Sequence, residues 1–285
     1  MTDKKIAALK KTSINIKRHV IESTYSCSSG HPGGSLSITD ILSVLYFSVM
    51  NVDANRPKWE DRDRLVLSKG HTAPALYGAL AEKGFFGREE LSRLRQCDSF
   101  LQGHPDMNKV PGIDMSTGSL GQGLSAANGM AIAGKYMKKD YHVFCILGDG
   151  ESQEGQVWEA AMTAAHYKLD NIIAFLDHNG LQIDGAVDEV MSLGAIDKKF
   201  EAFGWHVIKV DGHDIAQLLQ AVDAAKNTQG MPTLILCKTI KGQGVSFMEN
   251  RVEWHGAAPN KEQRDMAIAE LEQKIRDLEV LHHAE

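Results

Sequence analysis

The sequence of 285 residues has no uninterrupted apolar run near the length of about 18 residues that a membrane-spanning helix needs. Its first residues, MTDKKIAALKKTSINIKRHVI, mix charged residues into apolar positions and lack the apolar stretch of a secretory signal. Cysteine is also scarce, with four residues in the sequence. Cys27, Cys97, Cys145 and Cys237 are scattered and form no CxxC pair. These features predict a protein that does not enter a membrane and lies in the cytoplasm with reduced thiols.

Clustered basic residues are equally scarce. The formal net charge is −6, the isoelectric point is near 6.1, and no Lys/Arg cluster goes beyond adjacent pairs such as Lys4-Lys5 and Lys10-Lys11. Sequence-independent binding of nucleic acid needs a concentrated basic face, so no nucleic-acid partner is expected. The length and the hydrophobic content of 43% instead predict a globular protein, and we expect residues 1–285 to form one domain.

From about residue 142 onward, apolar runs and amphipathic segments alternate. Strands are expected at 142–147, 171–176, 205–210 and 232–240, with helices at 154–168, 191–204 and 215–227 between them. This order predicts an α/β fold with a doubly wound, mostly parallel sheet and helices on both faces. In the helix 154–168, one face of small residues is expected to pack on the sheet; its members are Val157, Ala160, Ala161, Ala164 and Ala165.

The first 140 residues are predicted to be richer in helix, with a strand within 63–70. They contain three loops in which histidine follows glycine, SSGHPGG, SKGHTAP and LQGHPDMN. The last segment, 260–285, is predicted to be an exposed helix with a frayed tail.

The sequence Gly148-Asp149-Gly150 follows the strand expected at 142–147. In an open parallel sheet, ligands bind beyond the carboxyl ends of the strands, where the loops leave for the helices. The two glycines allow a bulky anion to approach the backbone, and the start of the next helix favours negative charge. This loop is therefore a candidate phosphate site.

Asn179 follows Asp149 by 30 residues and lies at the end of the next strand. Oxygen ligands of low total charge suit Mg²⁺ or Ca²⁺, with a diphosphate, a water molecule and a backbone carbonyl such as that of Leu181 completing the set. The alternative is that both segments are simple turns, since Gly, Asp and Asn are common turn residues. Two other nucleotide motifs do not apply, because GxxxxGK[ST] is absent and GSLGQG at 118–123 follows no apolar strand.

The spacing of Gly-Asp-Gly and Asn resembles that of thiamine diphosphate enzymes, and six blocks resemble transketolase in transketolase order. They are SSGHPGGSLSITDIL, SKGHTAPALYGAL, GHPDMNKVPGIDMSTGSLGQGLSAANGMA, GDGESQEGQVWEAAMTAAHYKLDN, FEAFGWHVIKVDGHD and CKTIKGQGVSFMENRVEWHGAAP. The resemblance covers about residues 10–260 and implies the diphosphate-binding half of the fold.

The resemblance implies a role for each matching residue. The metal ligands would be Asp149, Asn179 and the carbonyl of Leu181. The residues that would contact the thiamine diphosphate are His71, Gly118, Leu120, Gly150, Asn179, Ile183 and His255, and Glu154 would be a buried glutamate that links two active sites across a dimer interface. The catalytic histidines would be His31 and His104 near the ketose hydroxyls, together with His255. Neutral imidazoles can both donate and accept hydrogen bonds to such hydroxyls and transfer protons near neutral pH.

The resemblance covers only one part of the family pattern. Transketolases continue into a pyrimidine-binding domain and a C-terminal domain, and a glutamate of the former assists the cofactor, for which this sequence offers no candidate. We therefore expect a thiamine-diphosphate-dependent transketolase, as in the pentose phosphate pathway, that is split into two chains. The second subunit would carry the missing domains in an α2β2 heterotetramer acting on sugar phosphates.

Two other interpretations stay open at this point. The chain is also compatible with an alpha subunit of another thiamine diphosphate enzyme, such as a 2-oxo acid dehydrogenase or a deoxyxylulose-phosphate synthase. A third interpretation is a non-catalytic module that binds the cofactor and engages other proteins. The histidine loops GHPGG, GHPD and WHGAAP favour sugar hydroxyls and therefore transketolase chemistry.

Overall fold

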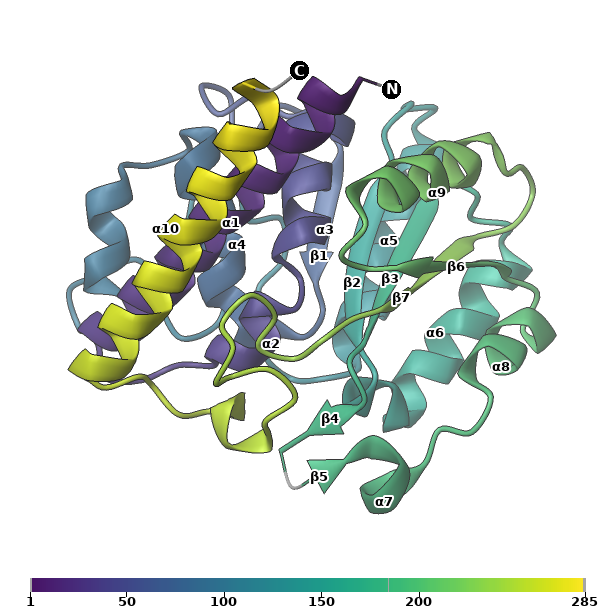
Figure 1. The fold of residues 1–285 in the computed structure, drawn as a ribbon. Helices are drawn as coiled ribbons and strands as arrows, with labels where there is room; N and C mark the ends of the chain where they lie inside the picture. The colour runs from purple at the N-terminus through teal and green to yellow at the C-terminus, as the bar shows by residue number, and fades with distance from the viewer. Residues whose placement is uncertain (1, 184, 284–285) are drawn as a thin grey trace.

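Five parallel strands form the central sheet in the computed structural model, which describes residues 2–183 and 185–283 (Figure 1). The order across the sheet is β1-β2-β3-β7-β6. The strands are β1 (Arg64–Leu67), β2 (Val143–Gly148), β3 (Ile172–His178), β6 (His206–Asp211) and β7 (Thr233–Lys238). Every strand predicted from the sequence is present within one or two residues of its expected bounds, and the mostly parallel sheet is confirmed.

Successive strand residues point to opposite faces of the sheet, and each face is buried by its own helices. Phe144 and Ile146 of β2 belong to one core. Val143, Cys145 and Leu147 belong to the other. A strand buried on both sides needs apolar residues at every position, which explains why the runs in the sequence are continuous and do not alternate.

The helices on the second face are α5 (Gln122–Tyr136), α6 (Gly155–His166) and α8 (Ile196–Ala202). In α6, the small-residue face packs as predicted, with Val157, Ala160, Ala161 and Ala164 buried and Ala165 partly buried. The helix predicted at 191–204 is only partly present. Gly194 has φ of 56°, in the left-handed region that an α-helix does not tolerate, so α7 (Val187–Met191) ends before it and α8 begins after it.

The first face is covered by helices from both ends of the chain. They are α1 (Asp3–Ser26), α2 (Pro32–Leu36), α3 (Thr39–Val44), α4 (Ala73–Lys83), α9 (Ile215–Asn227) and α10 (Lys261–His283). Short helical turns occur at Leu45–Val49, Gly70–Thr72, Arg88–Arg93, Gly150–Gln153 and Val252–His255, and a small antiparallel pair joins β4 (Leu181–Gln182) and β5 (Gly185–Ala186).

The helix predicted in segment 260–285 exists, and most of its residues are exposed or partly exposed, but one stripe of it is buried. In Figure 1, α10 runs along α1, and its residues Ala267 and Leu271 are fully buried in the core. The apolar positions of α10 are spaced to bury one narrow stripe against α1, although charged residues dominate its composition. The predicted tail at residues 284–285 lies outside the described residues.

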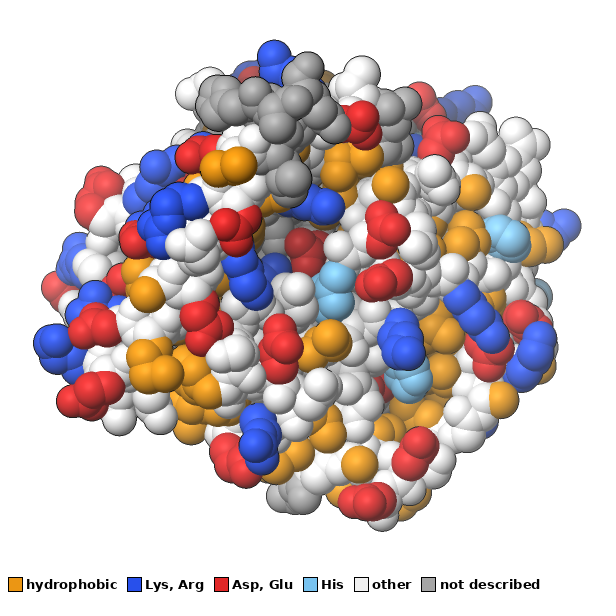
Figure 2. Space-filling model, in the orientation of Figure 1, with side chains coloured by type: hydrophobic (Ala, Val, Ile, Leu, Met, Phe, Trp, Pro, Cys, Tyr) orange, Lys and Arg blue, Asp and Glu red, His pale blue; other side chains and the backbone are white. Residues whose placement is uncertain are grey.

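On the face shown in Figure 2, basic and acidic side chains are interspersed. Across residues 2–183 and 185–283, no helix combines the length and the apolar character that crossing a membrane requires.

Candidate functional site

The carboxyl ends of the strands carry a cavity of about 330 Å³. In the β2–β3 pair, Gly148 lies opposite Asp177, so the loops that follow the two strands begin side by side. The sequence-predicted residues His31, His71, Gly118, Leu120, Asp149, Gly150, Glu154, Asn179, Leu181, Ile183 and His255 all line this one cavity. Loops far apart in sequence thus converge where a doubly wound sheet places its ligands.

Asp149 joins the loop after β2 to the loop after β3. Its carboxylate is only 2% exposed, and it accepts hydrogen bonds from the backbone N–H of Gly150 at 2.8 Å and of Gly180 at 2.6 Å. Asn179 accepts a hydrogen bond from the N–H of Leu181 at 3.1 Å and donates one to Asp177 at 2.9 Å. Asp149 therefore holds the two loops against each other, while Asn179 is fixed within its own loop.

The donor set fits a hard divalent cation that a diphosphate helps to hold. In the described part of the chain, no group of three or more His, Cys, Asp or Glu side chains is placed to bind a metal. Among the lining residues, Asp149, Asn179 and Leu181 instead offer a carboxylate, an amide oxygen and a backbone carbonyl. A Mg²⁺ or Ca²⁺ ion completes its shell with oxygens of a phosphate ligand and water in such a site.

Asp177 lies beneath the cavity floor as the centre of a buried polar cluster. It is fully buried and accepts hydrogen bonds from Ser37 at 2.7 Å, from Thr239 and from the ammonium group of Lys69. Burial disfavours its charged form, but the charge of Lys69 and these hydrogen bonds hold the pKa of Asp177 below its ordinary value. Since Asn179 also donates to Asp177, this cluster sets the orientation of the Asn179 side chain.

Lys69 and Lys241 bring two positive charges to the cavity. Both side chains are buried, with Lys69 2% and Lys241 1% exposed, and both line the cavity wall. Burial, with the nearby charge of Lys69, lowers the pKa of Lys241 to about 8. A lysine with so little solvent around its charge is stabilised by an anion. Lys69 already has the carboxylate of Asp177 beside it, so Lys241 in particular suits a phosphate-bearing ligand.

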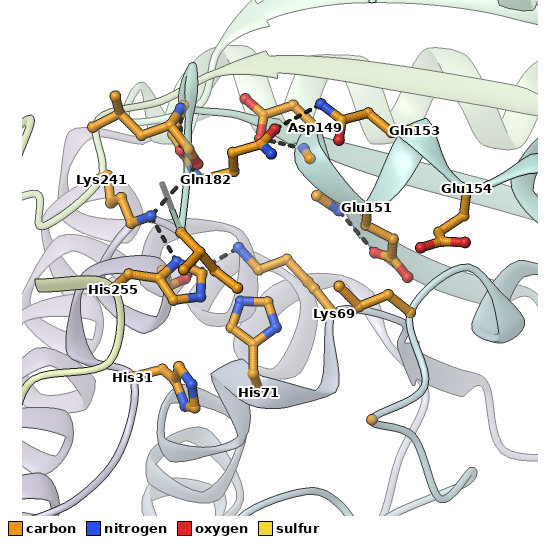
Figure 3. Close-up of a pocket in the computed structure, with 18 residues that line it drawn as sticks. His31, Lys69, His71, Asp149, Glu151, Gln153, Glu154, Gln182, Lys241 and His255 are labelled. Atoms are coloured by element: carbon orange, nitrogen blue, oxygen red, sulfur yellow. Dashed lines mark hydrogen bonds between the residues drawn. The ribbon is translucent and has the colours of Figure 1, made fainter. Parts of the chain in front are cut away.

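Three histidines from separate loops pack together opposite Asp149 (Figure 3). The rings of His71 and His255 stack with centroids 5.2 Å apart, and His31 meets both edge-on at 5.2 and 5.4 Å. Lys241 donates a hydrogen bond of 2.8 Å to Nδ1 of His255, which leaves Nε2 of that ring as the protonated nitrogen. The cavity thus presents oriented imidazole groups on one side and oxygen ligands on the other.

These imidazoles favour their neutral forms. Burial, aided by positive charges including Arg95, lowers the pKa of His31 to about 4. Burial, aided by Lys241, lowers the pKa of His255 to about 3, and burial with Lys69 lowers the pKa of His71 well below its ordinary value. Neutral imidazoles can accept as well as donate hydrogen bonds, as contacts with hydroxyl groups require.

His104 is the one predicted site residue that does not line the cavity wall. It is exposed and packs on Gly118, where a Cβ would lie 3.0 Å from the imidazole; Gly118 has φ of 150°, which favours glycine. The loop of His104 is anchored by the hydroxyl of Tyr77, which donates to the carbonyls of Gln102 and His104 at 2.9 Å. Burial, aided by Arg95, lowers the pKa of His104.

Glu154 lies at the rim of the cavity and is exposed in this chain, because it precedes the first residue of α6 at the open edge. Its burial was expected across a dimer interface and stays a prediction. Ile183 is also 67% exposed. A second buried carboxylate of this loop, beside Asp149, is Glu151, which accepts hydrogen bonds from Ser68 and from the N–H groups of Gly121 and Gly148 and so ties three loops together.

Several lining residues were missed in the sequence. Lys69, Glu151, Gln153, Gln182 and Lys241 reach the cavity, and Gln153 donates a hydrogen bond of 2.6 Å to Gln182. Lys69 and Lys241 lie inside the blocks SKGH and TIKG that carry the resemblance. Both lysines could have been predicted to line the cavity, because a candidate anion site needs nearby cations. The glutamines carried no comparable signal.

Comparison with known proteins identifies the family. Residues 9–275 match the model of the "transketolase, thiamine diphosphate binding domain". The chain is 48% identical to a 6-deoxy-6-sulfo-D-fructose transketolase subunit of Clostridium sp. (strain MSTE9), covering 91% of this chain and 94% of that one. It is 43% identical to one of the apulose-4-phosphate transketolase subunits of Phocaeicola vulgatus, covering 92% of this chain and 93% of that one.

Full-length transketolases match over less than half of their length. The human transketolase is 44% identical over 95% of this chain but only 43% of its own. The crystal structure of the Campylobacter jejuni transketolase superposes with a TM-score of 0.87 at 33% identity, over 92% of this chain and 42% of that one. The match in sequence and in fold shows that the chain belongs to the transketolase family and represents its thiamine diphosphate binding domain.

Proposed function

We propose that this chain is one subunit of a split transketolase that transfers a two-carbon ketol unit from a ketose to an aldose with thiamine diphosphate. The two relatives of matching length are named as transketolase subunits, which supports a separately encoded second subunit. That subunit supplies the pyrimidine-binding and C-terminal domains, and the assembly is an α2β2 heterotetramer. The observation that carries the proposal is the convergence of Asp149, Asn179 and the Leu181 carbonyl with three histidines on one cavity.

The metal and diphosphate occupy the deep part of the cavity in this proposal. Asp149, Asn179 and Leu181 bind Mg²⁺, while His71, His255 and the backbone of Gly150 hold the phosphates. Lys69 and Lys241 supply the positive charge that offsets the diphosphate. The absence of a side chain at Gly150 keeps the backbone free, since a Cβ there would lie 3.0 Å from Gln182.

Three residues of the cavity would hold the ring system of the cofactor. Gly118 and Leu120 would contact it through their backbone, and the exposed Ile183 would pack against the thiazolium. When bound, thiamine diphosphate supplies the carbanion chemistry of ketol transfer. The protein orients it and excludes water from it.

His31 and His104 act on the substrate side. As neutral imidazoles they bind the hydroxyl groups of the ketose and exchange protons with them, and His255 lies within the same histidine cluster. Glu154, exposed on this chain, becomes buried when a second active site is placed beside the first. The substrate is a ketose with an anionic group at its far end, in keeping with the sulfo and phosphate sugars for which the two relatives are named.

The cytoplasm is the proposed location. All four cysteines are free thiols in the structure, and Cys145 and Cys237 are buried inside strands, where they act as small apolar residues.

The test is reconstitution. The chain is purified with its second subunit, thiamine diphosphate and Mg²⁺, and transfer from xylulose 5-phosphate to ribose 5-phosphate is measured, with the sulfo and apulose sugars as alternative donors. We expect turnover only when both chains are present. Full turnover by this chain alone would overturn the two-subunit proposal, and release of CO₂ from pyruvate would overturn ketol transfer.

A further inference from the structure

A second buried network lies outside the cofactor cavity and ends on the segment that carries Lys241. Its members are Lys17 of α1, Asp40 of α3 and His213, in the turn between β6 and α9. Lys17 is 3% and Asp40 is 7% exposed, and their side chains meet at 3.3 Å. Lys17 also donates hydrogen bonds to Ser13 at 3.0 Å and to Thr39 at 2.5 Å.

The two nitrogens of His213 have different partners. Nδ1 lies 2.9 Å from the carboxylate of Asp40, and Nε2 lies 2.9 Å from the backbone nitrogen of Ile240. Because a backbone N–H can only donate, Nε2 must be the acceptor, and Nδ1 therefore carries the proton that is donated to Asp40. Burial opposes the ionisation of Asp40, but Lys17 and His213 together hold the pKa of that carboxyl below its ordinary value. The tautomer of His213 is thus set from both sides.

The turn that carries His213 has little freedom to move. The N–H of Gly212 donates to the carbonyl of Lys238 at 2.8 Å, and a Cβ at Gly212 would lie 2.4 Å from the side chain of Thr239. The imidazole is therefore docked against the end of β7 and meets the backbone one residue before Lys241.

Lys241 is in turn held on its other side. The N–H of Gly242 donates to the carbonyl of Gly33 at 2.9 Å, and the Lys241 ammonium reaches Nδ1 of His255 at 2.8 Å. Ile240 to Gly242 therefore form a short bridge whose first residue is fixed by His213 and whose last residue is fixed by α2. His213 itself is not among the residues that line the cofactor cavity.

We propose that His213 is a positioning residue for the cofactor site, which holds the Ile240 N–H so that Lys241 is directed at the diphosphate. This rests on the proposed function, since it takes the diphosphate as the ligand of Lys241. Supporting groups behind the residues that contact a bound ion commonly change affinity by about 10- to 100-fold. Loss of the Nε2 acceptor is therefore expected to weaken thiamine diphosphate binding by about tenfold.

Two substitutions distinguish the hydrogen bond made by Nδ1 of His213 from the one made by Nε2. In His213→Gln the amide oxygen can reach the position of Nε2 and accept from Ile240, whereas in His213→Asn the shorter amide can reach only the position of Nδ1, near Asp40. The affinity of the reassembled two-subunit enzyme for thiamine diphosphate, with Mg²⁺ present, is titrated for each. We expect His213→Asn to bind about tenfold more weakly and His213→Gln to lie close to the unchanged protein. His206→Asn, on β6 at the opposite end of the strand, is the matched control.

A double-mutant cycle with Lys241→Met distinguishes positioning from general weakening of the fold. If His213 acts through Lys241, His213→Asn adds no further loss of affinity once Lys241 is Met. Additive losses, or equal affinities for the Asn and Gln variants, would overturn the inference. Normal binding by Lys241→Met would also overturn the inference, whereas failure of the unchanged enzyme to bind thiamine diphosphate would overturn the proposed function of the site instead. Thermal melting of each variant confirms that the chain is folded.

Discussion

The carboxylate of Asp149 accepts a hydrogen bond of 2.6 Å from the backbone N–H of Gly180, which is the residue after Asn179. This contact joins the loop that follows β2 to the loop that follows β3, across the 12-residue helix α6 that separates them in the sequence. It explains why Gly-Asp-Gly and Asn-Gly occur 30 residues apart, since one helix and one further strand are needed to return the chain to the same edge of the sheet.

Replacement of Asp149 tests the metal site directly. Asp149→Asn removes the only carboxylate expected to bind the ion, so Mg²⁺-dependent affinity for thiamine diphosphate should fall by more than about 100-fold, the upper end of the effect of a supporting group. Calorimetric titration of the assembled enzyme with and without Mg²⁺ measures it. Asp223→Asn, an exposed residue on α9, is the control. Unchanged affinity in Asp149→Asn would place the diphosphate elsewhere.

Among the parts of the cofactor, only the diphosphate should interact with the lysines of the cavity. Lys241→Met removes a charge-assisted contact worth about 1.5–3 kcal/mol, which corresponds to a loss of affinity of about 10- to 100-fold. Binding of thiamine, which has no phosphate groups, should not change. Lys238→Met, an exposed lysine on the neighbouring strand end, serves as the control. An equal effect on thiamine and on thiamine diphosphate would contradict an electrostatic role.

Substitution of His31 or His104 should lower turnover of the sugar and leave the affinity for the cofactor unchanged. In His31→Ala and in His104→Ala, kcat/KM for the ketose donor is expected to fall by about 100-fold or more, which is typical of a lost proton-transfer group. The affinity for thiamine diphosphate should stay within about threefold. Steady-state kinetics and cofactor titration of the same preparations provide the comparison, and His206→Asn is a control outside the cavity. If cofactor affinity falls and kcat/KM at saturating cofactor does not, the two residues belong to the cofactor side.

The lowered pKa values of the cavity histidines predict a pH-dependent stability. His31 and His255 titrate with pKa values of about 4 and about 3 in the folded chain but of about 6.5 when unfolded. Between these values the unfolded state binds more protons, so the free energy of unfolding should decrease as the pH falls from about 6.5 toward 4. Urea unfolding at pH 7.5, 6 and 5 measures this slope. His255→Gln should show a shallower slope than the unchanged chain, and an equal slope would mean that His255 is protonated in the folded state.

The buried pair of Lys69 and Asp177 should matter more for stability than an exposed pair of the same residue types. Asp177→Asn leaves Lys69 as a buried charge without its carboxylate and is expected to cost about 3–5 kcal/mol of unfolding free energy. Asp170→Asn breaks the exposed pair with Lys135 and should cost about 1 kcal/mol or less. Urea denaturation reports both values. Similar costs for the two variants would show that solvent reaches Lys69.

The strands of the sheet, and the end of the sheet at which the loops of the candidate site lie, could be predicted because both depend on local sequence patterns. Continuous apolar runs in β2, β3 and β7 reflect burial on both faces, and the glycines and polar residues that end them mark the loops. The break before α8 was missed because Gly194 acts through its backbone conformation, which composition and periodicity do not report. The partial burial of α10 was missed because its apolar stripe is narrow, with Ala267 and Leu271 fully buried and Ile268, Ile275 and Leu278 partly buried among many charged residues.

By itself, the sequence determined the α/β class, the strand ends and the residues whose spacing carries chemistry, namely Asp149, Asn179 and the histidine loops. Only the tertiary structure decided that Lys69 and Lys241 flank the same cavity, that Glu154 lies exposed at its rim and that His213 reaches Ile240. The physical reason is that periodicity reports which face of an element is buried, whereas the convergence of charges from distant loops depends on how those elements pack together.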